Sequence, residues 1–335
     1  MFNMKKLAAA GITVVMAAAM AGCGGSSSGS SSGASSAPAE TEGKTYNVGV
    51  CQLVQHVALD AATQGFQDAL KEAFGDSVTF DVQNAQGDSN TCSTIVNSFV
   101  SADVDLIMAN ATAALQASAA GTSEIPVLGT SVTDYATALE LSDFDGTVGG
   151  NISGTSDLAP LDGQAELFTE LLPDVKTIGL LYCSAEPNSK FQVDTIRGYL
   201  ESAGYTCVDK SFSDSNDIAT VVTGATADCD ALYIPTDNTA ASNTEIINNI
   251  CEPAGIPIIA GEEGICKGCG IATLSIDYYE LGQKTGEMAA EILNGGDISA
   301  MAIEYAPNFT KEYIAERAEK LGITVPDDYV AIEAE

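Results

Sequence analysis

Two stretches of the chain decide its fold: DLIMANAT at residues 105–112 and DALYIPTDNT at residues 230–239. Each begins as a short apolar strand, turns through a few polar residues and continues into a helical segment. Each is then followed by a strand that opens on Ile-Pro, at Ile125 in the first case and at Ile256 in the second. The repeated order predicts two similar lobes related by a pseudo-two-fold axis, the alternative being a chance likeness of two βαβ units.

Strands and helices alternate along the rest of the chain as well. Apolar runs predict the strands, and apolar residues at helical spacing predict the helices between them. The expected strands cover residues 46–51, 78–82, 106–109, 125–128, 177–182, 205–208, 232–234 and 256–260. The expected helices cover residues 58–74, 91–100, 112–120, 160–172, 190–203, 218–226 and 242–252. We therefore expect an α/β fold with two doubly wound parallel-sheet lobes.

The N-terminus has the features of an export signal. Lys5 and Lys6 precede the apolar residues 7–21, a run shorter than the about 20 residues that a membrane-spanning helix needs. Small residues then precede Cys23, as at the cleavage site of a lipoprotein signal whose cysteine receives a diacylglycerol thioether. The alternative is an ordinary signal peptide with a chance cysteine. The Ser/Gly-rich residues after Cys23 are too polar to fold, which predicts a flexible tether.

These features predict a lipid-anchored protein outside the cell membrane. We expect a signal peptide at residues 1–22 and a lipidated Cys23 followed by a tether at residues 23–44. The mature protein would then be exported and held on the outer face of the cytoplasmic membrane. Several acyl chains on the cysteine would make this anchoring firm, since a single chain binds membranes only marginally.

The charge balance excludes one class of partner. The chain has 13 Lys and Arg residues against 46 Asp and Glu residues, a formal net charge of −33. No basic patch can neutralise phosphates, so we expect no nucleic-acid partner. The chain of 335 residues leaves room beyond the tether for two lobes of about 150 residues, each with its own core.

Eight cysteines remain besides Cys23. An even number in an exported protein permits disulfides, but several of these cysteines lie in apolar strand-like runs, where cysteine acts as a small hydrophobic residue. Cys266 and Cys269 have C-x-x-C spacing, but no second ligand pair follows, and the single histidine, His56, is distant in sequence. We expect free thiols and no metal or other cofactor, with a local Cys266–Cys269 disulfide as the open alternative.

Polar residues at the strand ends are the candidates for ligand binding. In open α/β sheets, ligands bind outside the carboxyl ends of the strands, so two facing lobes would bring two sets of loops to one cleft. Thr112 begins a helix whose free N–H groups could hold a carboxylate. Asp237 could accept hydrogen bonds from an ammonium group, unless it is only a helix cap. Further acids on such loops, which together predict a cationic or zwitterionic ligand, are Asp134, Asp157, Glu262, Glu263 and Asp277.

Motifs of common enzyme families do not occur in the expected lobes. There is no G-x-x-x-x-G-K-[ST] phosphate loop and no H-E-x-x-H zinc motif. The G-x-S-x-G pattern occurs only in the Ser/Gly-rich run at residues 25–33, where no expected strand precedes it to form a nucleophile elbow. A single histidine leaves one candidate for histidine-based acid–base catalysis. We expect a binding protein rather than an enzyme.

Several stretches resemble the ABC-transporter substrate-binding lipoproteins of the tryptophan/tyrosine type, which have the type I periplasmic-binding-protein fold. They span nearly all of the chain beyond the tether. The matching stretches are VCQLVQHVALD at residues 50–60, QNAQGD at 83–88, VTD at 132–134, TSD at 155–157, YIPTDNT at 233–239 and IDYYELG at 276–282.

The resemblance implies the solute-binding lipoprotein of an ABC importer, which acts as a monomer and docks on an ABC permease in the membrane. It would capture a small zwitterion, with an aromatic amino acid favoured, by closure of two lobes. The alternative is a ligand sensor of the same fold that is coupled to a membrane receptor. The residues expected to bind the ligand, from the matching stretches and the strand-end loops, are Gln52, Gln55, His56, Thr112, Ala113, Thr133, Asp134, Ser156, Asp157, Asp237, Asn238, Glu262 and Asp277.

The same resemblance implies that the chain crosses between the lobes three times. We expect these crossings near residues 153–156, 274–277 and 300–303. The first lobe would then comprise residues 45–153 and 277–301, with the helix at residues 279–293 returning to it. The second lobe would comprise residues 154–276 and 302–335.

The chain departs from the usual pattern of this family at three places. Gln55-His56-Val57 stands where Glu-His-Pro is usual, Glu262 stands where Asp is usual, and Tyr135 stands where Pro is frequent. The loss of a carboxylate at position 55 could change how a ligand's amine is held. Because the chain has no tryptophan, stacking on an aromatic ligand would depend on Tyr135, Phe191, Tyr278 or Tyr279.

Overall fold

The computed structural model describes residues 43–334. The expected signal peptide, Cys23 and nearly all of the expected tether lie outside these residues. Within them, no helix combines the length and the apolar character needed to span a membrane.

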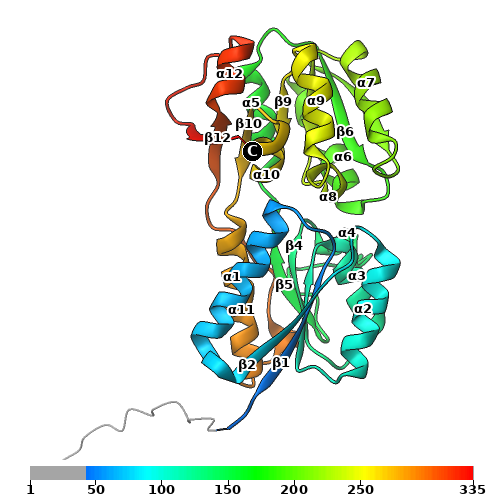
Figure 1. The fold of residues 1–335 in the computed structure, drawn as a ribbon, viewed down its shortest axis with the longest axis vertical. Coiled ribbons are helices and arrows are strands. Elements are labelled where there is room, and N and C mark those ends of the chain that lie inside the picture. The colour runs from blue at the N-terminus through cyan, green and yellow to red at the C-terminus, as the bar shows by residue number, and fades with distance from the viewer. Residues whose placement is uncertain (1–42, 335) are drawn as a thin grey trace, which may run out of the picture. The chain divides into compact units, whose positions relative to one another are not determined.

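The first lobe is built on a six-stranded parallel sheet in the order β11-β5-β4-β3-β1-β2 (Figure 1). Its strands are β1 (Tyr46–Gln52), β2 (Val78–Asn84), β3 (Leu106–Asn110), β4 (Val127–Val132), β5 (Ile152–Ser156) and β11 (Glu304–Tyr305). Its helices are α1 (Val57–Phe74), η1 (Gly75–Ser77), α2 (Ser89–Ser101), α3 (Thr112–Gly121), α4 (Tyr135–Ala138), α11 (Tyr278–Leu293) and η2 (Ile298–Ala300).

The second lobe is built on a seven-stranded sheet in the order β13-β12-β10-β9-β8-β6-β7, in which only the β10–β12 pair is antiparallel. Its strands are β6 (Thr177–Cys183), β7 (Thr206–Phe212), β8 (Ala231–Ile234), β9 (Ile258–Ala260), β10 (Ala272–Ser275), β12 (Thr310–Ile314) and β13 (Val330–Ile332). Its helices are α5 (Leu161–Leu171), α6 (Pro187–Ser202), α7 (Ile218–Asp228), α8 (Asn238–Ala241), α9 (Thr244–Ala254), α10 (Glu263–Cys269) and α12 (Ala315–Leu321).

The two lobes repeat one topology, which confirms the predicted fold class. The order β5-β4-β3-β1-β2 in the first sheet corresponds to β10-β9-β8-β6-β7 in the second. The likeness extends to single residues. Asp105, just before β3, accepts a hydrogen bond from the backbone N–H of Asn47 at 2.8 Å. Asp230, just before β8, likewise accepts from the backbone N–H groups of Lys176 and Thr177 at 3.0 and 2.9 Å. Each aspartate thus anchors the start of the neighbouring strand.

Both Ile-Pro strands begin later than expected, at Val127 and Ile258, directly after the proline. A proline has no N–H to donate to a sheet ladder, so it stands before the strand rather than inside it. β4 also continues to Val132 with a register shift against β5 after Gly129. The short helices α4, α8, α10 and α12 were not expected, because four to seven residues carry too little periodicity to predict a helix.

The chain passes between the sheets three times, after Ser156, after Ser275 and after Tyr305. The first two passages lie next to the expected crossings. The third lies later than residues 300–303, because Glu304 and Tyr305 pair with Thr155 and Ser156 as an added strand of the first sheet. Residues 154–156 and 302–305 therefore belong to the first lobe rather than to the second.

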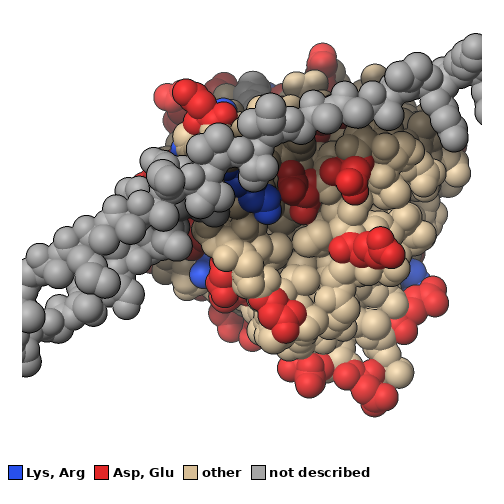
Figure 2. Space-filling model, turned by 90° about the horizontal axis from the view of Figure 1, so that it is seen from below, with Lys and Arg blue, Asp and Glu red and all other residues tan. Residues whose placement is uncertain are grey.

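Each sheet is covered on both faces by an apolar cluster. In the first lobe, Val50 packs with Phe66 of α1, while the neighbouring Cys51 packs on the other face with Phe99 of α2. The alternation follows from the two-residue period of a strand. The eight cysteines among the described residues are free thiols, and all except the partly exposed Cys207 are buried. Acidic side chains are scattered over the face of the molecule in Figure 2, with few basic ones among them.

Helices α1 and α11 approach each other closely through glycines. A Cβ atom on Gly65 would overlap the carbonyl oxygen of Tyr279, and one on Gly282 would overlap the carbonyl oxygen of Ala62. Helix α11, which follows the second passage between the lobes, therefore packs directly against the backbone of α1.

Replacing Gly282 by Ala should lower the free energy of unfolding by about 1–3 kcal/mol, because the two helix backbones must separate to admit the methyl group. Gly198→Ala is the matched control. Gly198 lies in α6 with no neighbour near its Cβ position, so the change should be neutral or stabilise the protein by about 0.5–1 kcal/mol. Urea denaturation of both variants measures the difference. Equal stability of the two variants would contradict this account of the packing.

Candidate ligand site between the lobes

A narrow cavity lies between the strand-end loops of the two lobes. Its volume is about 10 Å³, which is about the space of one water molecule. The first lobe and the crossings contribute His56, Leu59, Ser131, Thr133, Asp157 and Tyr278 to its walls. The second lobe contributes Asn188, Thr236, Asp237, Asn238, Ala241 and Glu262. The loops after β4, β5, β8, β9 and β10 meet here, as expected for a site outside the carboxyl ends of parallel strands.

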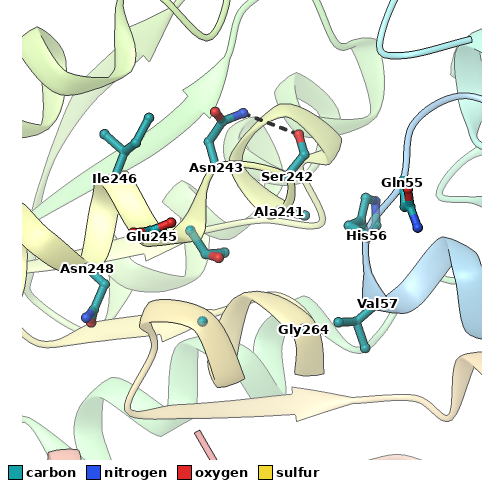
Figure 3. A pocket seen from close by; sticks show the side chains of 12 residues that line it. Gln55, His56, Val57, Ala241, Ser242, Asn243, Glu245, Ile246, Asn248 and Gly264 are labelled. Carbon is teal, nitrogen blue, oxygen red and sulfur yellow. Dashed lines mark hydrogen bonds between the residues drawn. The ribbon is translucent and has the colours of Figure 1, made fainter. Parts of the chain in front are cut away.

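Two wider recesses adjoin this cavity. One, of about 680 Å³, is bordered by Gln55, His56 and Val57 of the first lobe and by residues 241–246, 248, 264 and 268 of the second (Figure 3). The other, of about 300 Å³, has Ala113 and Asn238 among its lining residues. His56 and Asn238 thus stand between the inner cavity and the outer recesses.

The structure brings part of the predicted site together. The predicted residues that line the inner cavity are His56, Thr133, Asp157, Asp237, Asn238 and Glu262. Gln55 and Ala113 line only the outer recesses. Gln55 is exposed and lines the wide recess rather than the inner cavity.

The other five predicted residues lie elsewhere, and four of them have hydrogen-bond partners within the protein. Gln52 is buried under α1, where it donates to Asp60 at 2.6 Å and accepts from Thr63 at 2.7 Å. Asp134 caps α4, and Ser156 donates to the carbonyl oxygen of Thr133 at 2.9 Å. The remaining two are Thr112, buried at the start of α3, and Asp277, which caps α11 and lines a separate recess with Glu280 and Glu304.

Sequence reasoning missed several lining residues: Leu59, Ser131, Asn188, Thr236 and Ala241. Thr236 could have been found, since it directly precedes Asp237 in a stretch already singled out. Asn188 carries no signal in the sequence, because it reaches the cavity only through the packing of α6 against the loop after β8. Its amide donates to the carbonyl oxygen of Thr236 at 3.0 Å.

Three buried carboxyl groups dominate the electrostatics of the cavity, and within residues 43–334 no lysine or arginine lines it. Burial raises the pKa of Asp157 to about 6, against the hydrogen bond from Tyr278 that lowers it. Burial likewise raises the pKa of Glu262 to about 7. The pKa of Asp237 is raised by burial first and by the nearby charge of Glu186 second. Each group would be stabilised in its ionised form by a cation.

Two of these three carboxyl groups are committed to helix N-termini. Asp237 accepts from the backbone N–H groups of Ala240 at 2.8 Å and Cys183 at 2.6 Å. Glu262 accepts from the backbone N–H groups of Gly264 at 2.7 Å and of Ile265. Asp237 is therefore a helix cap, the alternative that the sequence left open, as well as a wall of the cavity.

Asp157 differs from the other two acids. Its Oδ2 accepts from the Tyr278 hydroxyl at 2.9 Å, but its Oδ1 is buried without a partner. Two further lining residues, His56 and Ser131, also have a buried polar atom without a partner, Nδ1 and Oγ respectively. An unpaired buried polar atom costs about 1–3 kcal/mol, so three of them around one cavity mark it as a place for a polar molecule.

Backbone strain is stored at the same edge of the first sheet. Ala111 has φ of 89° just after β3, and Ser131 has φ of 53° at the end of β4. Non-glycine residues in the left-handed region cost about 1–3 kcal/mol and persist where the surrounding fold imposes them, often at binding sites. At Ser131 the strained turn places the side chain in the cavity wall.

Tyr278 is the one of the four candidate aromatic residues that reaches the cavity. Tyr135 is buried in the first lobe, with its hydroxyl bonded to the carbonyl oxygen of Thr155 at 3.1 Å. The Tyr279 hydroxyl bonds to Asp68 on the surface. Phe191, on α6, is absent from the walls of the cavity and of both recesses.

The geometry defines a two-lobed binding protein with a polar site between its lobes, and comparison places it in a family. The model of a protein family described as "ABC transporter substrate binding protein" matches residues 47–335, so the chain belongs to that family. Its two parallel-sheet lobes are those of the type I periplasmic-binding-protein fold. Members of the family are extracytoplasmic binding proteins and not enzymes.

Three similar proteins narrow the comparison. A tyrosine-binding protein of Clostridioides difficile (strain R20291) is 39% identical over 267 residues, which cover 78% of this chain and 77% of that protein. A structure from Streptococcus pneumonia in complex with L-Trp has 34% identity and a TM-score of 0.81, covering 85% of this chain and 97% of the other. The ligand-free, open structure of a Clostridium difficile substrate-binding protein with adhesive properties has 36% identity and a TM-score of 0.67, covering 87% of this chain and 100% of the other.

The raised pKa values predict how stability depends on pH. Asp157 and Glu262 have pKa values of about 6 and 7 in the folded chain, above the values of about 3.9 and 4.3 expected in an unfolded chain. Their contribution to stability is therefore full below pH 4 and is lost as the pH rises through 6 and 7. The midpoint temperature of thermal unfolding of the ligand-free protein should therefore decrease as the pH is raised from 5 to 8. Asp157→Asn and Glu262→Gln should each flatten that dependence, and an unchanged slope in both variants would contradict the assignment.

Proposed function

We propose that this protein is the substrate-capturing lipoprotein of an ABC importer and that it binds a free amino acid, with aromatic amino acids preferred. The observation that carries the proposal is the cavity between the lobes, where Asp157 has an unpartnered buried oxygen and where no lysine or arginine of the described chain offers a counter-charge.

A zwitterion suits these walls. Its ammonium group would lie against the free oxygen of Asp157, with Asp237 and Glu262 adding negative charge nearby. Its carboxylate would be held by neutral donors, of which the unpartnered hydroxyl of Ser131 lies in the walls. Charge-assisted hydrogen bonds of this kind are about twice as strong as neutral ones.

An aromatic side chain is favoured by Tyr278, whose ring lines the cavity, and by the relatives whose names refer to tyrosine and L-Trp. Offset stacking or edge-to-face contact between two rings contributes about 0.5–1.5 kcal/mol beyond the area that it buries.

Capture would proceed by separation and closure of the lobes. A cavity of about 10 Å³ admits no amino acid, so the lobes have to part for a ligand to enter. The three connecting segments after Ser156, Ser275 and Tyr305 would be the hinge. Ligand would shift the balance toward closure only through contacts with both lobes, which the mixed composition of the cavity wall supports.

Delivery would occur at the membrane. Cys23 would carry the lipid, and the Ser/Gly-rich stretch that follows would hold the two lobes, as a monomer, within reach of an ABC permease.

Purified protein, freed of any copurified ligand by partial unfolding and dialysis, should bind at least one aromatic amino acid. Thermal-shift screening of the twenty amino acids, followed by calorimetry on those that stabilise the protein, measures this binding. Ligand stabilises only the folded form, so the melting temperature should rise with ligand concentration. Absence of a shift with all twenty would refute the amino-acid proposal.

Two aspartates form a matched pair for locating the ammonium group. Asp157→Asn should weaken binding roughly 10- to 100-fold, because a charge-assisted hydrogen bond is worth about 1.5–3 kcal/mol. Asp134→Asn makes the same chemical change at a helix cap outside the cavity, where asparagine caps equally well, and should leave affinity unchanged. Equal effects of the two changes would remove Asp157 from the proposed site.

The lipid anchor has its own test. Cys23→Ala should leave the precursor without its lipid acceptor, so the protein should move from the membrane fraction to the soluble exported fraction. Fractionation with immunodetection, together with incorporation of labelled fatty acid into the unmodified protein, measures the change. Equal membrane association of both forms would show that another feature anchors the chain.

A further inference from the structure

Glu186, which precedes the first turn of α6, accepts hydrogen bonds from the loop after β8. Its Oε1 accepts from the backbone N–H of Thr239 at 2.8 Å and from the Thr239 hydroxyl at 2.7 Å. Its Oε2 accepts from the backbone N–H of Asn238 at 3.0 Å and from the Asn238 side-chain amide at 2.8 Å. Four donors from two adjacent residues thus converge on one carboxylate, which does not itself line the inner cavity.

The contact with Glu186 decides which way the Asn238 side chain faces. A carboxylate can only accept, so the Asn238 group that faces Glu186 must be the NH₂ group. The carbonyl oxygen Oδ1 therefore faces the opposite way, and it lies 3.2 Å from Nε2 of His56 in the other lobe. Because Oδ1 can only accept, Nε2 of His56 must carry the proton in this contact.

The second nitrogen of the His56 ring is then determined as well. Burial lowers the pKa of His56, which favours the neutral ring with a single proton. With that proton on Nε2, Nδ1 has a free lone pair. Nδ1 is buried without a partner, although His56 lines the inner cavity as well as the wide recess in Figure 3.

We propose that Glu186 is a positioning residue for ligand recognition: through Asn238 it holds His56 with its proton on Nε2, so that Nδ1 accepts a hydrogen bond from an N–H or O–H group of the ligand. This inference rests on the proposed function, since it concerns how the same site selects its ligand. It adds a requirement that the carboxylates alone do not impose, namely a second donor group at the His56 end of the cavity.

The hydrogen bonds that run from Glu186 through Asn238 to His56, here called the relay, also couple ligand recognition to closure of the lobes. His56 belongs to the first lobe, whereas Asn238 and Glu186 belong to the second, so the Nε2 contact exists only while the lobes are together. A second contact between the lobes is built on the same helix. Gln192 of α6 donates to the Thr236 hydroxyl at 2.6 Å, and that hydroxyl lies 3.3 Å from the hydroxyl of Thr133 in the first lobe. The first half of α6, through Glu186 and Gln192, therefore positions two residues, Asn238 and Thr236, that contact the first lobe.

The single histidine of the chain makes the proposal directly measurable. In protein with ¹⁵N-labelled histidine, long-range ¹H–¹⁵N spectra distinguish a protonated from an unprotonated ring nitrogen, and every signal belongs to His56. Without ligand, the wild-type protein should show a proton on Nε2 and none on Nδ1. In Glu186→Gln, the Asn238 amide loses its fixed orientation, so the second tautomer should appear and affinity for the best amino acid should fall roughly tenfold.

Glu201→Gln is the control, since Glu201 lies exposed in the last turn of the same helix and should change neither the spectrum nor the affinity. Asn238→Asp is a second variant in case Glu186→Gln folds poorly. It places a carboxylate beside Nε2 of His56, and this negative charge favours the doubly protonated ring, so a proton should also appear at Nδ1. A wild-type proton on Nδ1 would overturn the proposal, as would a Glu186→Gln spectrum identical to wild type or a changed tautomer with unchanged affinity. Failure of every amino acid to bind would reject the proposed function but would leave the ligand-free spectrum as a test of the relay.

Discussion

The structure depends on one constraint, the common direction of parallel strands. All strands of a parallel sheet end at the same edge, so the loops that follow them must gather there. In this chain two sheets with the same strand order present such edges to one cavity, and its polar walls come almost entirely from those loops. The close seating of α11 on α1 serves the same arrangement, because it holds the first lobe together across a chain that leaves for the second lobe and returns.

Burial of polar groups then gives the cavity its chemical character. Water cannot satisfy groups that are enclosed, so each buried carboxyl group either accepts hydrogen bonds from the protein or remains unpaired at a cost. Asp237 and Glu262 accept from helix N-termini, whereas Asp157 keeps one oxygen unpaired. The carboxyl groups that cap helices and the carboxyl group that is free to meet a ligand are therefore of the same chemical type. Only their hydrogen-bond partners distinguish them.

That distinction explains which residues could be predicted. Asp157, Asp237 and Glu262 follow strands and line the cavity, and the position of a strand end can be inferred from an apolar run. Their part in binding a ligand stays a prediction. Asp134 and Asp277 follow the same rule, but their side chains turn back to cap α4 and α11. Gln52 was expected in the site and instead bridges β1 to α1, since its amide lies under the helix. Sequence distance separates Asn188 and Glu186 from the loop that they hold, so no local pattern revealed them.

The sequence by itself determined the alternation of strands and helices, the internal likeness of the lobes and the edge of each sheet at which a ligand would bind. These features follow from hydrophobic periodicity and from strand direction, which are local properties. Only the tertiary structure decided which polar atoms at that edge have partners and which do not. Hydrogen bonding between Glu186, Asn238 and His56 joins residues from three separate parts of the chain, and the state of a ring nitrogen depends on all three at once.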